Sequence, residues 1–258
     1  MLRGLEKKAA IVTGAARGIG EAICRLLAAQ GVRVAVTDLD EKAAEKVADS
    51  LGGGAQAFHI DVSKRASVKA CFSAVETAFG GYDILCANAG VSNMRLVVDL
   101  TDEDWDFNFD VNARGVFLTN QIAVRHFLAS GKRGVIVNTA SLAAKMGAPW
   151  LAHYSASKFA VLGFTQALAR EVAAQGIRVN CVCPGFVRTS MQERELAWEA
   201  SLRNMTSEAV LQEYVSLTPM GRIEEPEDVA KTVLFLASDL SGFITGEALN
   251  VTGGVRMD

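Results

Sequence analysis

The chain has 258 residues, of which 50% are hydrophobic and 21% are charged, and its formal net charge at pH 7 is −3. This length suits one large α/β domain or two small domains. The low net charge and the lack of a basic run argue against binding to nucleic acid or to an anionic membrane surface. We expect no membrane span, because no apolar run reaches about 18 residues. We also expect no signal peptide, because the charged N-terminal segment enters a strand pattern at once.

The cysteines and histidines indicate neither a disulfide framework nor a metal site. The five cysteines lie inside apolar periodic segments, at positions Cys24, Cys71, Cys86, Cys181 and Cys183. In a strand, the last two side chains would lie on the same face. We expect all five to be reduced core thiols of a cytoplasmic protein. The three histidines are scattered, so no metal is expected.

A strand, a glycine-rich turn, a helix and a second strand follow one another near the N-terminus. The runs 8–13 and 32–37 predict the strands, and the second ends in Asp38. Glycines in the turn between them, Gly14–Gly20, let the backbone approach a pyrophosphate, and the helix N-terminus supplies N–H donors. The spacing differs from the common G-x-G-x-x-G fingerprint. The strand–turn–helix–strand frame nevertheless favours nucleotide binding over a turn without a ligand.

The acid at the end of the second strand predicts NAD rather than NADP. An ionised Asp38 accepts hydrogen bonds from the ribose hydroxyls of NAD. The 2′-phosphate of NADP would bring a like charge to about 4 Å, where the repulsion reaches roughly 4 kcal/mol at an effective dielectric near 20, as an upper guide. Arg17 in the glycine turn can attract a phosphate, but the residue after the acid is Leu39 rather than a second base.

The remaining elements continue an alternation of strands and helices. Strands are predicted over 55–60, 82–87, 134–139, 176–182 and 246–251, and helices over 64–79, 102–129, 154–174 and 226–237. Open α/β sheets bind ligands at the carboxyl ends of their strands. We therefore expect Gly14, Asp38, Asp61 and Asn88 to lie along one edge of the sheet. An N-cap role is an equally good interpretation of Asp61.

The polar, weakly helical segment 186–218 interrupts this alternation. Long excursions at the carboxyl edge of a sheet are often lids. Met191, Trp198 and Met205 would then provide apolar cover over the nicotinamide. The alternative, that they anchor an ordinary surface helix, stays open.

Tyr154 and Lys158 have the spacing of neighbours on one helix face. An unperturbed tyrosine, with a pKa of about 10, is a poor base near neutrality. We expect the nearby ammonium to lower the pKa of Tyr154. Ser141 would hold a substrate oxygen while Tyr154 gives or takes its proton. These residues predict an acid–base site for an alcohol or a ketone, although a Tyr-x-x-x-Lys pair alone is more often an ordinary helix face.

Several motifs, in this order, resemble those of the short-chain dehydrogenase/reductase family over essentially the full length. They are Thr13-Gly14-x-x-x-Gly18-x-Gly20, Asp61-Val62, Asn88-Ala89-Gly90, Asn112, Ser141, Tyr154-x-x-x-Lys158 and Pro184-Gly185. One small departure is Cys86-Ala87-Asn88, where many members have two successive asparagines. The retained Asn88 is the one expected near the cofactor.

The resemblance implies one domain, residues 1–258, with a Rossmann-type doubly wound parallel sheet of strand order 3-2-1-4-5-6-7 and helices on both faces. It implies a tetrad in which Tyr154 is the general acid/base, Ser141 orients the substrate oxygen, Lys158 also holds the nicotinamide ribose and Asn112 positions a relay water. The implied cofactor contacts are Gly14, Arg17, Gly18, Ile19, Gly20, Asp38, Asp61, Val62, Asn88, Gly90, Tyr154, Lys158, Pro184, Gly185, Val187 and Thr189.

Segments 186–222 and 252–258 look most similar to bacterial polyol and vicinal-diol dehydrogenases, such as sorbitol, galactitol and butanediol dehydrogenases. The expected function is therefore NAD-dependent oxidoreduction of a small secondary alcohol or ketone, as a polyol or sugar alcohol. One alternative is a 3-oxoacyl-thioester (acyl carrier protein) reductase, for which NADPH and a basic docking surface would be expected. Another is a catalytically silent nucleotide-binding regulator, which should lack a member of the tetrad. The resemblance also implies a homotetramer that pairs helices 102–129 and 154–174 with their symmetry mates.

Overall fold

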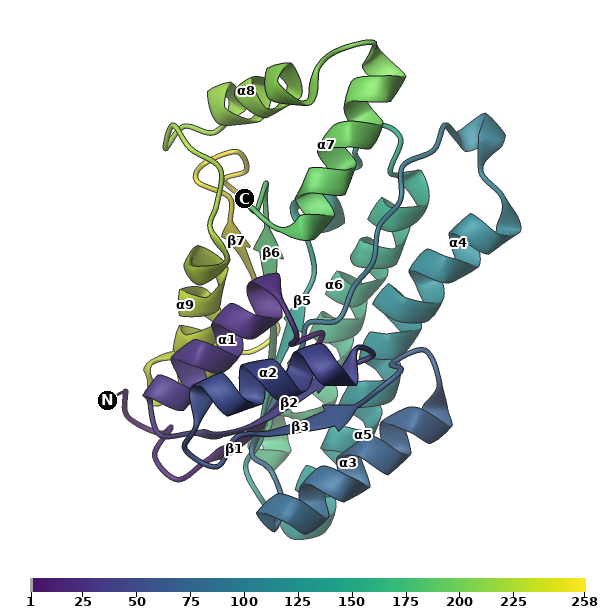
Figure 1. The fold of residues 1–258 in the computed structure, drawn as a ribbon. Coiled ribbons are helices and arrows are strands. Elements are labelled where there is room, and N and C mark those ends of the chain that lie inside the picture. The colour runs from purple at the N-terminus through teal and green to yellow at the C-terminus, as the bar shows by residue number, and fades with distance from the viewer. Residues whose placement is uncertain (1) are drawn as a thin grey trace.

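A parallel sheet runs through the molecule in the order β3-β2-β1-β4-β5-β6-β7, with helices on both faces (Figure 1). The computed structural model describes residues 2–258. The strands are β1 Ala9–Thr13, β2 Arg33–Asp38, β3 Gln56–His59, β4 Ile84–Ala87, β5 Val135–Thr139, β6 Arg178–Pro184 and β7 Ala248–Val251. Every neighbouring pair is parallel, so the carboxyl ends of all strands meet at one edge. The predicted fold class and strand order are confirmed.

The helices cover the sheet in two layers. They are α1 Gly18–Ala29, α2 Glu41–Leu51, α3 Arg65–Phe79, α4 Asp102–Asn108, α5 Gly115–Ser130, α6 Ala152–Val172, α7 Ser190–Arg203, α8 Ser207–Leu217 and α9 Pro226–Ala237. One core lies between the sheet and α1, α2 and α9, and the other lies between the sheet and α3, α5 and α6. Successive strand residues alternate between these cores. Cys181 and Cys183 thus share one core, while Val182 lies in the other.

The five cysteines are free and buried, as predicted. Among residues 2–258, no group of His, Cys, Asp and Glu side chains has the arrangement of a metal site. Within the same range, no helix combines the length and the hydrophobicity that a bilayer span requires.

Two helical features differ from the sequence prediction. Helix α2 lies in a stretch to which no helix is assigned above; Asp40 caps it by accepting a hydrogen bond from the Ala43 amide. The expected helix over 102–129 is present and runs on to Ser130, but a π-helical turn, Phe109–Arg114, lies within it between α4 and α5. Asn112 lies in this turn and is fully buried. Its side chain bonds to the backbone of another loop, and π-turns of this kind often mark functional sites.

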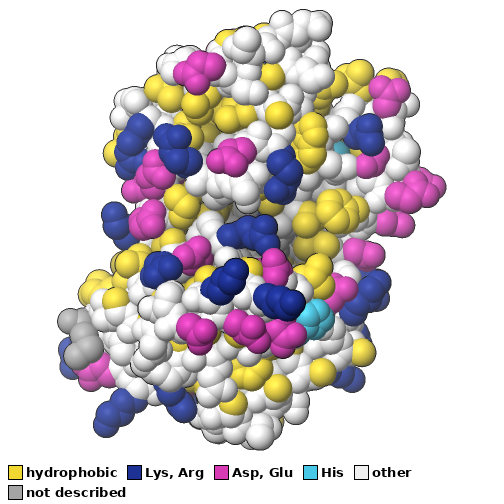
Figure 2. Space-filling model, in the orientation of Figure 1, with side chains coloured by type: hydrophobic (Ala, Val, Ile, Leu, Met, Phe, Trp, Pro, Cys, Tyr) yellow, Lys and Arg dark blue, Asp and Glu magenta, His cyan; other side chains and the backbone are white. Residues whose placement is uncertain are grey.

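Segment 186–218 forms two helices with a small core of their own. Helices α7 and α8 project beyond the ends of β6 and β7 at the top of Figure 1. Their shared cluster is Leu196, Ala200, Val210, Tyr214 and Ile223. Met205 packs against this cluster, as the anchor interpretation requires, while Met191 and Trp198 are half-buried. The space-filling view shows a hollow between this part and the body, with basic side chains beside it (Figure 2).

Candidate active site

The glycine turn between β1 and α1 is sterically restricted to glycine. Gly14 and Gly18 have φ angles of +62° and +57°, in the left-handed region. A Cβ on Gly14 would lie 2.7 Å from Ala89 Cα, and one on Gly20 would lie 2.1 Å from Gly14 O. No side chain caps α1 at Arg17. The amides of the first turn, which includes Ile19, therefore have no side-chain cap and are available to an anionic group.

Asp38 lies at the end of β2, beside the glycine turn. Its Oδ2 accepts a hydrogen bond from the Ala16 amide at 3.0 Å, and its Oδ1 accepts one from the Asp40 amide at 3.0 Å. Each carboxylate oxygen has a second acceptor position, so the group keeps capacity for ribose hydroxyls. Arg17 forms an exposed ion pair with Asp40 at 3.3 Å rather than with Asp38.

Asn88, which follows β4, forms hydrogen bonds at the ends of β1 and β5. Its Nδ2 donates to Thr13 O at 3.1 Å and to Gly14 O at 3.2 Å, and its Oδ1 accepts from Thr139 Oγ1 at 3.2 Å. Its side-chain amide is thus used within the protein, and it fixes the turn that the cofactor is expected to contact. Gly90 follows two residues later in the chain.

Asp61 and Val62 act locally within the loop before α3. Asp61 Oδ1 accepts from the Ser63 amide at 3.0 Å and from Ser63 Oγ at 2.6 Å. The N-cap position of α3 is Lys64, so Asp61 closes a turn instead of capping that helix. Val62 is buried against the start of α5, where a Cβ on Gly115 would lie 2.8 Å from Val62 Cγ2.

The four tetrad residues converge from three elements. Ser141 follows β5 and accepts a hydrogen bond from the Ala143 amide at 3.1 Å, and Lys158 Nζ lies 5.7 Å from the centre of the Tyr154 ring. A Cβ placed on Gly90 would lie 3.3 Å from both Asn112 Oδ1 and Lys158 Nζ. The side-chain amide of Asn112 and the ammonium group of Lys158 therefore both lie beside Gly90.

Asn112 is held by the backbone of Val91 and by the Ser157 hydroxyl. Its Oδ1 accepts from the Val91 amide at 2.9 Å, and its Nδ2 donates to Val91 O at 2.9 Å and to Ser157 Oγ at 3.0 Å. Lys158, only 3% exposed, donates to Thr139 O at 3.0 Å. These bonds place α6 and the loop after β4 in a fixed relation.

The pKa of Tyr154 is raised above its ordinary value, which is opposite to the expected direction. Burial is the main cause, the negative charge of Glu195 adds to it, and the neighbouring Ser141 hydroxyl lowers the pKa. Burial also lowers the pKa of Lys158 to about 8. The phenol is removed from water and faces an acid, and both effects raise its pKa. Near neutral pH the phenol is therefore protonated.

The loop after β6 is held by an acid that the sequence does not reveal. Gly185, which follows Pro184, donates from its amide to Glu224 Oε2 at 2.5 Å and to Val251 O at 3.0 Å. Val187 forms a parallel bridge with Glu224. Burial raises the pKa of Glu224 to about 7.

Helix α7 starts against the glycine turn and reaches the loop after β4. Thr189 caps it by accepting from the Gln192 amide at 3.3 Å, and Thr189 Cγ2 lies 3.3 Å from the Cβ position of Gly18. Ser92 Oγ donates to Glu195 Oε1 at 2.5 Å. The two residues are far apart in sequence and neither belongs to a motif, so sequence reasoning had no signal for this pair.

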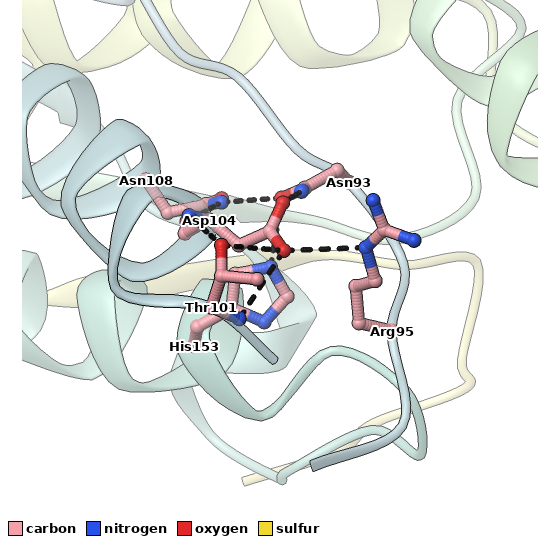
Figure 3. A network of polar contacts seen from close by, with 6 residues as sticks. All are labelled: Asn93, Arg95, Thr101, Asp104, Asn108 and His153. Carbon is pink, nitrogen blue, oxygen red and sulfur yellow. Dashed lines mark hydrogen bonds and ion pairs between the residues drawn. The ribbon is translucent and has the colours of Figure 1, made fainter. Parts of the chain in front are cut away.

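A polar network holds the loop after β4 from its other side (Figure 3). Asn93 is its centre: Asn93 Oδ1 lies 2.7 Å from His153 Nε2 and accepts from Asn108 Nδ2 at 2.6 Å, while Asn93 Nδ2 donates to Asp104 Oδ1 at 2.5 Å. Arg95 contacts the other oxygen of Asp104 at 3.2 Å. Because His153 precedes Tyr154, the network links this loop to the helix that carries the phenol.

Comparisons with known proteins agree with this geometry. Residues 14–256 match the family described as Enoyl-(Acyl carrier protein) reductase. The chain belongs to the short-chain dehydrogenase/reductase family. It is thus an NAD(P)-dependent oxidoreductase by family, as its motifs predict.

Several members of the family are similar to the chain over nearly its full length. The 3-oxoacyl-[acyl-carrier-protein] reductase FabG of Vibrio cholerae is 37% identical and covers 98% of this chain and 99% of its own length. A (3R)-3-hydroxyacyl-CoA dehydrogenase of Canis lupus familiaris is 38% identical, with 98% of each chain covered. A solved 3-ketoacyl-(acyl-carrier-protein) reductase from Brucella melitensis, complexed with NADH, has a TM-score of 0.89 and 35% identity, covering 98% of this chain and 100% of that one.

These relatives do not support the expected polyol-dehydrogenase subfamily. Their names favour the alternative, a reductase of 3-oxoacyl groups.

Proposed function

We propose that the protein reduces the ketone of 3-oxoacyl thioesters to the 3-hydroxyacyl product, with NADH as reductant. The observation that carries the proposal is the full-length similarity to 3-oxoacyl reductases, combined with a complete tetrad in one site. Both acyl carrier protein and coenzyme A appear in the names of the relatives. The thioester carbonyl and the ketone two carbons away from it are common to both.

The protonation of the site suits reduction. The bound cofactor supplies a hydride to the ketone carbon. Ser141 donates a hydrogen bond to the ketone oxygen, and Tyr154 transfers its proton to that oxygen as negative charge develops there. The raised pKa of Tyr154 keeps the phenol protonated near neutrality, as a general acid must be. Lys158 supplies positive charge beside the phenol, and Asn112 holds the loop after β4 through both backbone groups of Val91.

The glycine turn and Asp38 suit NAD. The amides at the start of α1 would bind the pyrophosphate, and the Asp38 carboxylate, held by the Ala16 and Asp40 amides, would accept from the adenosine ribose. The charge of Asp38 opposes a 2′-phosphate. We also propose a homotetramer, formed through the exposed apolar side chains of α4, α5 and α6, and a cytoplasmic location, as the unpaired buried thiols suggest.

The test is product analysis after incubation with acetoacetyl-CoA and NADH. We expect 3-hydroxybutyryl-CoA, detected by mass spectrometry, in an amount equal to the NADH oxidised. Tyr154→Phe is the matched control, since it removes only the phenolic hydroxyl. Equal product from the variant would show that another group protonates the oxygen, and no product from the wild type would reject the proposed substrate class.

A further inference from the structure

Helix α7 carries two acids that face different parts of the molecule. Glu199 belongs to the α7–α8 pair, where it accepts from Arg203 Nη1 at 2.7 Å and from the Tyr214 hydroxyl. Glu195, one turn earlier, is bonded instead to Ser92 in the loop after β4. Helix α7 is stabilised by interactions that do not involve Glu195, because Thr189 caps the helix and the apolar cluster packs it against α8.

The bond to Ser92 brings Glu195 close to the tetrad. Its partner Ser92 is only 4% exposed and follows Gly90 and Val91, which lie against Lys158 and Asn112. The negative charge of Glu195 raises the pKa of Tyr154, and burial raises the pKa of Glu195 itself. The effect on Tyr154 requires the carboxylate to lie close to the phenol, and Glu195 itself is half-buried.

The loop that carries Ser92 is held in place, so the hydrogen-bonded pair of Ser92 and Glu195 has a defined geometry. The network of Asn93, Asp104, Asn108 and His153 anchors the same loop, and Asn112 holds Val91 on both of its backbone groups. Glu195 Oε1 accepts from Ser92, whereas Oε2 accepts no hydrogen bond from residues 2–258. One carboxylate oxygen is thus available to a substrate beside the reacting ketone.

We propose that Glu195 is a specificity-determining residue that selects substrates carrying a hydroxyl group near the reacting ketone. The inference rests on the proposed function and narrows its substrate class to hydroxylated 3-oxoacyl thioesters. A substrate hydroxyl donates to the free oxygen of Glu195, so the carboxylate stays paired when substrate excludes water. A purely aliphatic acyl chain leaves that oxygen unpaired, and an anionic group is repelled.

The test compares two thioesters that differ by one hydroxyl. The N-acetylcysteamine thioesters of 3-oxohexanoate and 5-hydroxy-3-oxohexanoate are reduced with NADH, and kcat/KM is measured for each. We expect the wild type to prefer the hydroxylated substrate by about tenfold or more, which corresponds to about 1.4 kcal/mol. Glu195→Leu should lose this preference, mainly by gaining activity on the plain chain, and Glu195→Gln should keep part of it.

Glu193→Gln is the matched control, because Glu193 is an exposed acid in the first turn of the same helix. Its preference should equal that of the wild type, and NADH affinity should be the same in all variants. An unchanged ratio in Glu195→Leu, or a wild type that prefers the plain chain, would overturn the inference. If neither thioester reacts, the proposed function fails by itself, and the inference is then tested on acetoin against butan-2-one, a pair that also differs by one hydroxyl.

Discussion

Removing the charge of Asp38 should shift the cofactor preference toward NADPH. The variant of choice is Asp38→Asn, which keeps the size of the side chain and one acceptor oxygen for the two amides that now bond to the carboxylate, those of Ala16 and Asp40. Asp40→Asn is the control. It removes a neighbouring acid that lies in an exposed pair with Arg17, away from the expected ribose position.

The magnitude follows from the charge and exposure of Asp38. A 2′-phosphate placed about 4 Å from the carboxylate would be repelled by roughly 4 kcal/mol at an effective dielectric near 20. Asp38 is half-buried, so solvent and salt reduce this value. We expect at least about 1.4 kcal/mol to remain, which is a tenfold preference for NADH in kcat/KM.

The assay is NADH and NADPH oxidation at 340 nm, at saturating ketone. Asp38→Asn should raise kcat/KM for NADPH about tenfold and lower that for NADH several-fold, because the neutral amide accepts more weakly from ribose hydroxyls. The thermal unfolding temperature of the variant shows how much stability is lost with the hydrogen bond from the Ala16 amide. Equal use of both cofactors by the wild type would refute the reasoning, as would an equal shift in Asp40→Asn.

Four further predictions concern the phenol, the ammonium, the lid and the assembly. Tyr154→Phe should lower kcat by about 10²–10⁴-fold and leave NADH binding intact, whereas Lys158→Met should lose both; a Tyr154→Phe enzyme with more than about a tenth of normal turnover contradicts the acid role. Ketone reduction should decline above pH 8, because Lys158, with a pKa of about 8, loses its proton while Tyr154, with a raised pKa, keeps its own; a constant rate from pH 7 to about 10 argues against this. Hydrogen exchange in 186–218 should slow when cofactor and substrate bind, and no change would favour the surface-helix interpretation. Light scattering should show a tetramer, because α4, α5 and α6 expose five large apolar side chains: Trp105, Phe107, Phe117, Leu128 and Phe159. A fully active dilute monomer would contradict this prediction.

The sheet could be predicted from the sequence because most strands are short apolar runs followed by a glycine or a polar residue. Its order came from the resemblance, since strand pairing depends on contacts between distant residues. Helix α2 was missed although Asp40 provides an N-cap, because its sequence is mostly polar and only Ala44, Val47 and Ala48 are buried. Periodicity alone could not show the π-turn, since Asn112 is turned to Val91 by the tertiary structure.

The site was predicted in outline, and its electrostatics were not. The spacing of Tyr154 and Lys158 places them on one helix face, and the structure keeps them close. The direction of the pKa shift of Tyr154 depends on burial and on Glu195, which comes from a helix far along the chain. The bonds from Ser92 to Glu195 and from Gly185 to Glu224 likewise join residues separated by 103 and 39 positions. No local pattern encodes such pairs.

Reduction of 3-oxoacyl thioesters at this site is tested most directly by comparing two sets of kcat/KM values from one enzyme preparation. The first is measured for acetoacetyl-CoA with NADH, and the second for a panel of sugar alcohols and vicinal diols with NAD. We predict that the thioester value exceeds every polyol value by at least about a hundredfold, which is about 2.7 kcal/mol in transition-state stabilisation. A polyol that is oxidised more efficiently than the thioester is reduced would contradict the claim.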